Sequence, residues 1–186
     1  MNKASTILSM MICLALVFSV SAQEKSAPTY GGVATCKACH LTKNSGAQYK
    51  LWEASPHAKA FEDLKTEAAK AVGAKVGVAD PSTSAKCLKC HVTAHGVDAK
   101  MKGPKFTNEE GVGCESCHGP GSEYKGRQVM KDIYDGKVKG ADYGLIATDE
   151  ALCVTCHNAE SPTFKGFDFK TYSAKIAHPV PVPAAK

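Results

Sequence analysis

Apolar residues are distributed very unevenly along this chain of 186 residues. A continuous apolar run extends from Ile7 to Val20, after one early lysine and before two small residues. This pattern predicts a cleaved secretory signal peptide at residues 1–22, because the run is shorter than the ~20 residues that a membrane-spanning helix needs. We therefore expect an exported, periplasmic protein without a transmembrane segment, whose single domain is residues 23–186.

Large apolar residues are sparse after this segment, and their spacing is typical of short helices. Ser55 suits an N-cap and Pro56 the first helical position, so a helix is predicted over residues 56–72. Four residues of this segment, spaced by four, three and four positions, share one face of the helix. They are His57, Phe61, Leu64 and Ala68.

Further helices are expected on the same grounds, whereas strand signals are weak. The predicted fold class is therefore mainly α, with short helices and loops and little or no sheet. The additional helices are expected near residues 46–53, over Cys87–His91 and Ser122–Ile133, and in a segment capped by Thr148 that carries Cys153–His157.

The spacing of the cysteines is the most informative feature of the sequence. Apart from Cys13, which lies inside the apolar run, the cysteines form four CxxC pairs, and each pair is followed directly by histidine. A disulfide framework or zinc ribbons would account for paired cysteines but not for four following histidines. The four motifs are Cys36, Cys39 and His40; Cys87, Cys90 and His91; Cys114, Cys117 and His118; Cys153, Cys156 and His157.

CxxCH is the attachment signature of c-type haem, in which the two thiols form thioethers with the porphyrin and the histidine coordinates the iron. We therefore predict four covalently attached haem c groups, closely packed, around which the short helices are wrapped. Porphyrins would then supply most of the core that the sparse apolar side chains cannot. The shortest interval between motif histidines, from His91 to His118, predicts the second and third haems as neighbours.

Three of the seven histidines remain for the opposite faces of four irons, namely His57, His95 and His178. One iron is left without a second histidine. Three alternatives stay open for it: a methionine ligand, Met101 or Met130; an open or water-bound face; or completion by a partner.

The three remaining histidines differ in context. His57 is placed at a helix start, where the dipole keeps an imidazole neutral, so we expect it to bind the iron of a haem other than the one it follows. If the segment after His91 is helical, His95 points the same way as His91 and must serve a different haem. His178 lies in an extended, apolar tail that we expect to dock, so that His178 also binds an iron. The alternative for His57 is a core histidine bonded to a backbone carbonyl. For His95 it is a solvent-facing or propionate-bonding histidine, and for His178 a disordered tail.

Two stretches carry a family resemblance. GVGCESCHGPGSEY, residues 111–124, and W-x-x-S-P-H-A-K-A-F, from Trp52 to Phe61, resemble the tetrahaem cytochrome c-554 family of exported electron carriers. The resemblance extends over residues 30–178 and implies a mainly helical fold with closely packed haems. It also implies three irons with two histidines each and one five-coordinate iron, the second in sequence.

The same resemblance matches His57 and His178 to histidines that bind the far side of an iron in the family. The family has another such histidine soon after the third motif, where this chain has none. In contrast, His95 occurs where the family is apolar, so the iron that it serves is not given by the resemblance.

Charge points to the class of partner. Without Lys3 the chain has 22 basic against 18 acidic residues, and Arg127 is its one arginine. A lysine-dominated surface suits loose docking of redox proteins that weakens with salt, whereas an exported chain without an arginine patch is not expected to bind nucleic acid. We expect an electron-transfer protein that shuttles electrons between redox partners. The alternative is a haem enzyme that reduces a small nitrogen or oxygen species, such as nitric oxide, at one open haem.

Overall fold

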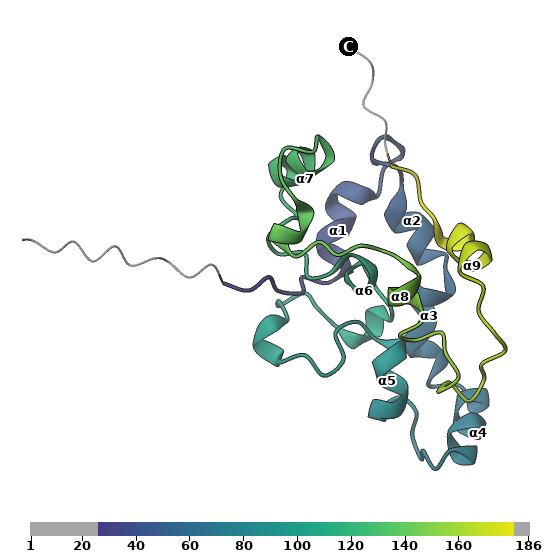
Figure 1. Cartoon of the computed structure of the whole chain (residues 1–186). Helices are drawn as coiled ribbons and strands as arrows, with labels where there is room; N and C mark the ends of the chain where they lie inside the picture. The colour runs from purple at the N-terminus through teal and green to yellow at the C-terminus, as the bar shows by residue number, and fades with distance from the viewer. Residues whose placement is uncertain (1–25, 181–186) are drawn as a thin grey trace, which may run out of the picture.

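A computed structural model of the chain describes residues 26–180. The predicted signal peptide, residues 1–22, lies outside them. The described part consists of short helices joined by turns and loops and contains no strand, which confirms the mainly α fold class (Figure 1). Its α-helices are α1 (Val33–His40), α2 (Gln48–Glu53), α3 (Pro56–Asp63), α4 (Glu67–Lys75), α5 (Ala85–His91), α6 (Cys114–His118), α7 (Arg127–Tyr134), α8 (Glu150–Cys153) and α9 (Phe169–Ile176).

Four 3₁₀ turns and one isolated bridge complete the regular structure of the described residues. The bridge pairs Tyr30 with Lys102 in parallel. None of the helices in this part of the chain is long and apolar enough to cross a membrane. The 3₁₀ turns are η1 (Lys43–Ser45), η2 (Ala99–Met101), η3 (Asn108–Glu110) and η4 (Gly140–Tyr143).

The helices α2, α3 and α5 begin close to where the sequence predicts them, and Ser55 and Pro56 hold the expected positions before and at the start of α3. A single helix over residues 56–72 is wrong, because the chain divides it into α3 and α4. Thr66 starts the second helix, since its Oγ1 accepts a hydrogen bond from the Ala69 N–H at 3.2 Å. Because an N-cap residue begins a new helix, α3 does not continue through Thr66.

Two other helix boundaries also differ from the prediction. The helix expected from Ser122 begins at Arg127. The cap of α8 is Asp149 and not Thr148, because the Asp149 carboxylate accepts a hydrogen bond from the Leu152 N–H at 2.9 Å. The Thr148 hydroxyl instead donates to the Cys117 carbonyl at 3.2 Å, so it ties this segment to the third motif.

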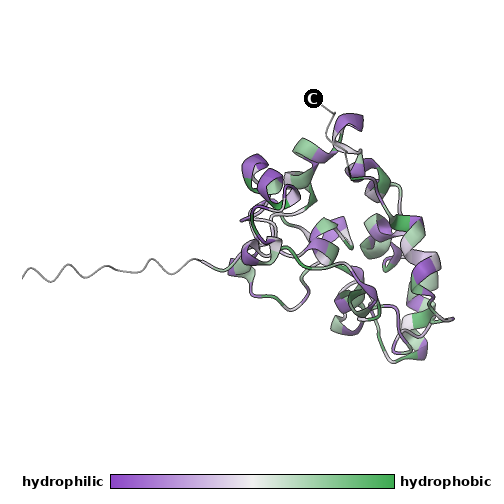
Figure 2. Cartoon of the chain, turned by 45° about the horizontal axis from the view of Figure 1, so that its top comes forward, coloured by the Kyte–Doolittle hydropathy of each residue, from purple (hydrophilic) through white to green (hydrophobic). Residues whose placement is uncertain are grey.

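The apolar core of the described protein is small. Phe61 and Leu64 from the α3 region pack against Leu88 and Val92 from the α5 region, with Cys87 beside them. Figure 2 shows hydrophobic stretches spread over most of the helices rather than gathered in one layer. Large apolar side chains that remain exposed are Leu51, Val76, Tyr134, Ile146, Val154, Phe164, Tyr172 and Val180.

Candidate haem sites

Each CxxCH motif lies on or beside a helix. The first ends α1, the second ends α5, the third is the whole of α6, and the fourth spans the end of α8 and the turn after it. In that turn the His157 N–H still donates to the Cys153 carbonyl at 3.0 Å. All eight cysteines of these motifs are free thiols. A helical CxxCH turn therefore presents two thiols and an imidazole together at each site.

Hydrogen bonds between thiols join the motifs in two pairs, and the Cys117 thiol of the third motif also lies near those of Cys153 and Cys156 in the fourth. A hydrogen bond between the thiols of Cys36 and Cys114 lowers the pKa of Cys36. Burial, followed by the neighbouring Cys156 thiol, raises the pKa of Cys90 to about 11. The first motif thus lies against the third, and the second lies against the fourth.

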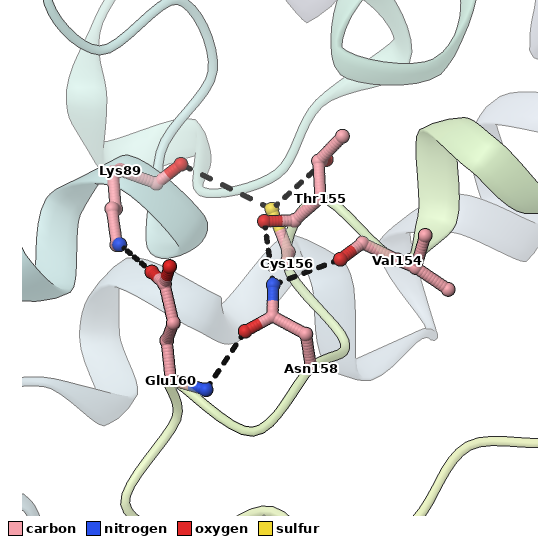
Figure 3. A network of polar contacts seen from close by, with 6 residues as sticks. All are labelled: Lys89, Val154, Thr155, Cys156, Asn158 and Glu160. Atoms are coloured by element: carbon pink, nitrogen blue, oxygen red, sulfur yellow. Dashed lines mark hydrogen bonds and ion pairs between the residues drawn. The ribbon is translucent and has the colours of Figure 1, made fainter.

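A polar network also holds the second motif against the fourth (Figure 3). Lys89, inside the second motif, forms an ion pair with Glu160, and its carbonyl is 4.0 Å from the Cys156 thiol. Asn158 closes the turn after the fourth motif, since its side-chain amide donates to the Val154 carbonyl at 2.8 Å. Its Oδ1 accepts from the Glu160 N–H at 2.9 Å, which positions Glu160 for the ion pair.

Two of the three remaining histidines face motif histidines. The ring centroids of His57 and His157 are 6.0 Å apart, and those of His118 and His178 are 5.8 Å apart. A metal–imidazole nitrogen bond is about 2 Å and the nitrogen lies about 1 Å from the ring centroid, so imidazoles on opposite sides of one metal have centroids about 6 Å apart. Both pairs have the spacing that an iron between them requires.

Burial favours the neutral form of His57, His118 and His178, which is the form that binds a metal. Burial, and then the neighbouring His157, lowers the pKa of His57. Burial likewise lowers the pKa of His118, followed by the effects of His178 and His40, and it is the largest cause of the lowered pKa of His178. Metal ligation requires neutral imidazole, so these environments favour it.

The two other motif histidines have one ring nitrogen occupied by a hydrogen-bond partner. The His91 Nδ1 is 2.6 Å from the Ala60 carbonyl, and the His40 Nδ1 is 3.1 Å from the Gln48 side-chain oxygen. A donor bond from Nδ1 fixes the tautomer and leaves Nε2 to bind a metal. Gln48 also donates to the Pro179 carbonyl at 2.9 Å, so it joins His40 to the residue that follows His178.

The aromatic segment near the C-terminus contacts the fourth motif. Phe167 stacks on His157 with centroids 4.8 Å apart and planes 13° from parallel. Tyr172 in turn packs on Phe167 at 5.2 Å. This stacking fixes the His157 ring from one side.

His95 lies apart from the other histidines. α5 ends at His91 with extended backbone at Val92, so His95 does not continue the helix. It is exposed in a turn after Ala94, whose φ is 51°, and has no hydrogen bond or ring contact with another described residue. The condition under which His95 and His91 would point the same way is therefore not met.

Sequence reasoning missed several buried polar groups around the motifs. Glu115, between the cysteines of the third motif, is 3% exposed and accepts hydrogen bonds from three backbone N–H groups. Thr93 is 1% exposed, and its hydroxyl oxygen accepts from the Gly113 N–H at 2.8 Å and from the Ser116 hydroxyl at 2.9 Å. The one signal for Glu115 in the sequence was a carboxylate between the two cysteines of a haem motif.

These residues fit covalently held haem. Four helical thiol pairs each carry an adjacent imidazole, and two of those imidazoles face a second one across the distance of a metal. Within residues 26–180, by contrast, no cluster of three or more His, Cys, Asp or Glu side chains is arranged to hold a metal ion by itself. The fold and the sites define a helical protein of the c-type cytochrome class.

Comparisons with known proteins give the family. The family model "Cytochrome c554 and c-prime" matches residues 35–119. Cytochrome c-554 of Nitrosomonas europaea is 32% identical over 177 residues, which cover 84% of this chain and 70% of that protein. The solved reduced state of cytochrome c554 from the same organism matches with a TM-score of 0.53 at 28% identity, over 81% of this chain and 79% of the other.

The chain belongs to the cytochrome c554 family. It is accordingly a c-type cytochrome, an electron carrier with covalently bound haem c. Its partners belong to the class of redox proteins.

Proposed function

We propose that this protein is a tetrahaem electron carrier of the periplasm that accepts electrons from one redox protein and passes them to another. Each of the four CxxCH motifs binds one haem through its two thiols, and the motif histidine binds the iron. Haem c supplies the one-electron redox couple when bound. The observation that supports this most directly is the combination of four free thiol pairs with two imidazole pairs at metal spacing.

Two irons have both axial ligands assigned. His157 and His57 bind the iron of the fourth motif, and His118 and His178 bind that of the third, as their centroid distances of 6.0 and 5.8 Å support. This pairing also agrees with the sequence expectation that His57 serves a haem other than the one it follows. Two imidazoles keep an iron six-coordinate in both oxidation states, which suits outer-sphere electron transfer.

The iron of the second motif is proposed to be five-coordinate. His91 lines a cavity of about 590 Å³ together with Cys87, Cys90 and Cys156. No other histidine and no methionine lines this cavity in the described part of the chain. This observation favours a second candidate function, the reduction of a small nitrogen or oxygen species at the second iron. Nitric oxide binding to the reduced protein followed by turnover would support that alternative, and a spectrum unchanged by nitric oxide would exclude it.

Export is proposed from the apolar run before residue 23, which has the length and flanks of a signal peptide. Docking of the redox partners is proposed to use the lysine-dominated surface, because exposed lysines attract acidic patches at low ionic strength. Determining the N-terminus of the periplasmic protein would test the export step, since cleavage after Ala22 is expected.

The ligand assignments can be tested in the holoprotein by mass spectrometry and electron paramagnetic resonance. The mass should exceed that of the polypeptide by four haems. His57→Ala and His178→Ala should each convert one low-spin iron per molecule to high spin, because each removes one axial imidazole. Three or fewer attached haems would contradict the tetrahaem proposal, and unchanged spin states in both variants would contradict the two ligand pairs.

A further inference from the structure

The iron of the haem proposed at the first motif has no second axial ligand assigned so far. His40 is oriented by Gln48 through Nδ1, which leaves Nε2 for the iron. His57 and His178 are assigned to other irons, and His95 is exposed in its turn without a contact to another described residue. A second ligand supplied by this chain therefore comes from another residue type near α1.

Helix α7 presents an apolar face that the polypeptide leaves incompletely covered. Val129, Met130 and Ile133 lie on one side of this helix by their spacing, opposite charged and amide residues. Gln128 donates to Asp132 at 2.9 Å along the polar side, which is thus turned to solvent. No residue of α7 is buried, although an amphipathic helix of this kind normally packs its apolar stripe against a core.

The chain enters α7 from the third motif, at the place where that motif lies against the first. Tyr124 is 8% exposed, and its hydroxyl donates to the Gly119 carbonyl at 2.9 Å. Burial, Glu115 and then the thiols of Cys36 and Cys114 raise the pKa of Tyr124, so its ring lies beside both motifs. Arg127 begins α7 three residues later, and Figure 1 draws this helix next to α1. Met130 is thus in the first turn of a helix that lies next to the helix of the first motif.

Met101, the other methionine candidate, is held at the wrong end of α1. Its carbonyl accepts a hydrogen bond from the Tyr30 N–H at 2.8 Å, and Tyr30 precedes the start of α1. His40 is the last residue of that helix, about 12 Å further along at 1.5 Å per residue. The contacts of Met101 therefore direct it away from His40.

We propose that the Met130 sulfur is the second axial ligand of the iron bound by His40. This inference rests on the proposed function, because it presumes a haem at the first motif. It gives the chain one His/Met site beside two bis-histidine sites and one five-coordinate site. Since a thioether ligand raises the reduction potential relative to a second imidazole, the first haem has a higher potential than the bis-histidine haems.

The test compares Met130→Leu, Met130→His and Met101→Leu in the purified holoprotein, after haem content has been measured by mass for each. The wild-type ferric protein should show the weak far-red charge-transfer band of thioether-ligated haem. Met130→Leu should lose that band and double the high-spin signal, from one iron to two. Met130→His should lose the band but stay low spin at the first iron, with a lower potential there. Met101→Leu should match the wild type.

Several outcomes would overturn the proposal. They are a wild-type protein without the far-red band, a band that survives Met130→Leu, or a band lost in Met101→Leu instead. A gain of one high-spin iron in His95→Ala, with none in Met130→Leu, would assign the site to His95. Fewer than four haems by mass in the wild type would contradict the proposed function itself, which separates the two failures.

Discussion

Glu110 is a carboxyl group whose charge changes near neutral pH. Its Oε2 accepts a hydrogen bond from the Val33 N–H at 2.9 Å, whereas Oε1 is enclosed without a hydrogen-bond partner among the described residues. Burial raises the pKa of Glu110 to about 7 from a usual 4.5, against the opposing effect of the Val33 bond, and the negative Glu115 adds to the rise. The thiols of Cys36 and Cys114 are the other titratable groups that face it.

This raised pKa predicts a pH-dependent stability. The folded protein holds the Glu110 proton more tightly than the unfolded chain does. The contribution of protonated Glu110 to the free energy of unfolding is therefore fully present below about pH 4.5 and is lost as the pH rises through 7. The Glu110 side chain is partly exposed, which reduces the effect. Between pH 5 and 8 we therefore expect the free energy of unfolding of the wild type to fall by only about 1–2 kcal/mol more than that of Glu110→Gln. Urea unfolding of both holoproteins at the two pH values measures the difference.

The neighbouring Glu109 provides the matched control for this prediction. It is exposed, and the Thr107 hydroxyl lowers the pKa of Glu109 instead of raising it. Glu109→Gln should therefore leave the loss of stability between pH 5 and 8 as in the wild type. Parallel pH profiles for Glu110→Gln and the wild type would show that Glu110 titrates normally.

The CxxCH motifs could be recognised in the sequence because attachment of haem c requires this spacing, and their role as four haem sites stays a prediction. His57 could also be predicted, since Ser55 and Pro56 mark the helix start that positions it. The partner of His91 could not, because it is the carbonyl of Ala60 and every residue has a carbonyl. Any residue type can supply a backbone acceptor, so such a partner can be identified only from the folded structure.

Among the helices, α1 and α6 are joined by one buried carboxylate. Glu115 of α6 accepts hydrogen bonds from the N–H groups of Gly31 and Gly32, each at 2.8 Å, just before α1 begins. The Gly121 N–H donates to the same side chain at 2.7 Å. Three N–H donors around one carboxylate make strong, charge-assisted bonds, so this residue holds the first and third motifs in register.

Glu115→Gln should destabilise the holoprotein by about 2–3 kcal/mol, because the amide keeps one oxygen but turns its NH₂ group toward an N–H donor. Guanidinium unfolding followed by far-ultraviolet circular dichroism measures this loss. Glu53→Gln, at an exposed position of α2, serves as the control and should change stability by less than about 0.5 kcal/mol. Equal stability of the two variants would show that the Glu115 carboxylate does not join the helices.

Helix positions were predictable where caps are unambiguous and wrong where a second cap intervenes. Pro56 starts α3 as expected, but Thr66 begins α4 inside what periodicity presents as one helix. The error has a physical origin: apolar spacing continues across the break to Ala68, although Ala68 is exposed and α4 contributes no residue to the small core. The spacing of apolar residues shows which face of a helix is apolar. Only the capping hydrogen bond of Thr66 shows where α3 has ended and α4 begins.

For the molecule as a whole, the arrangement of the four motifs could not be predicted from their intervals. The shortest interval favours the second and third as neighbours, and Thr93, just after the second motif, does bind the third. The thiol contacts, however, join Cys36 to Cys114 and Cys90 to Cys156, across 78 and 66 positions. Contacts at such separations depend on how every intervening helix packs, which the local sequence does not encode.

The polypeptide itself has too little apolar burial to hold together the nine short α-helices of residues 26–180. The helices of the described part are four to nine residues long, and isolated helices below ~12 residues are marginal in water. Their stability must therefore come from packing. Yet the buried apolar side chains of residues 26–180 are only Val33, Ala60, Phe61, Leu64, Val78, Pro81, Leu88, Val92 and Tyr124.

We therefore expect the full chain produced without haem attachment to be largely unfolded. Its far-ultraviolet circular dichroism should lose most of the helical signal of the holoprotein, and heating should give no cooperative transition. The exposed apolar side chains explain the dependence, because Leu51, Ile146 and Tyr172 gain cover only if a large apolar group lies against them. Retention of the helical signal with a sharp thermal transition would mean that polypeptide contacts suffice, and that haem is added to a preformed fold.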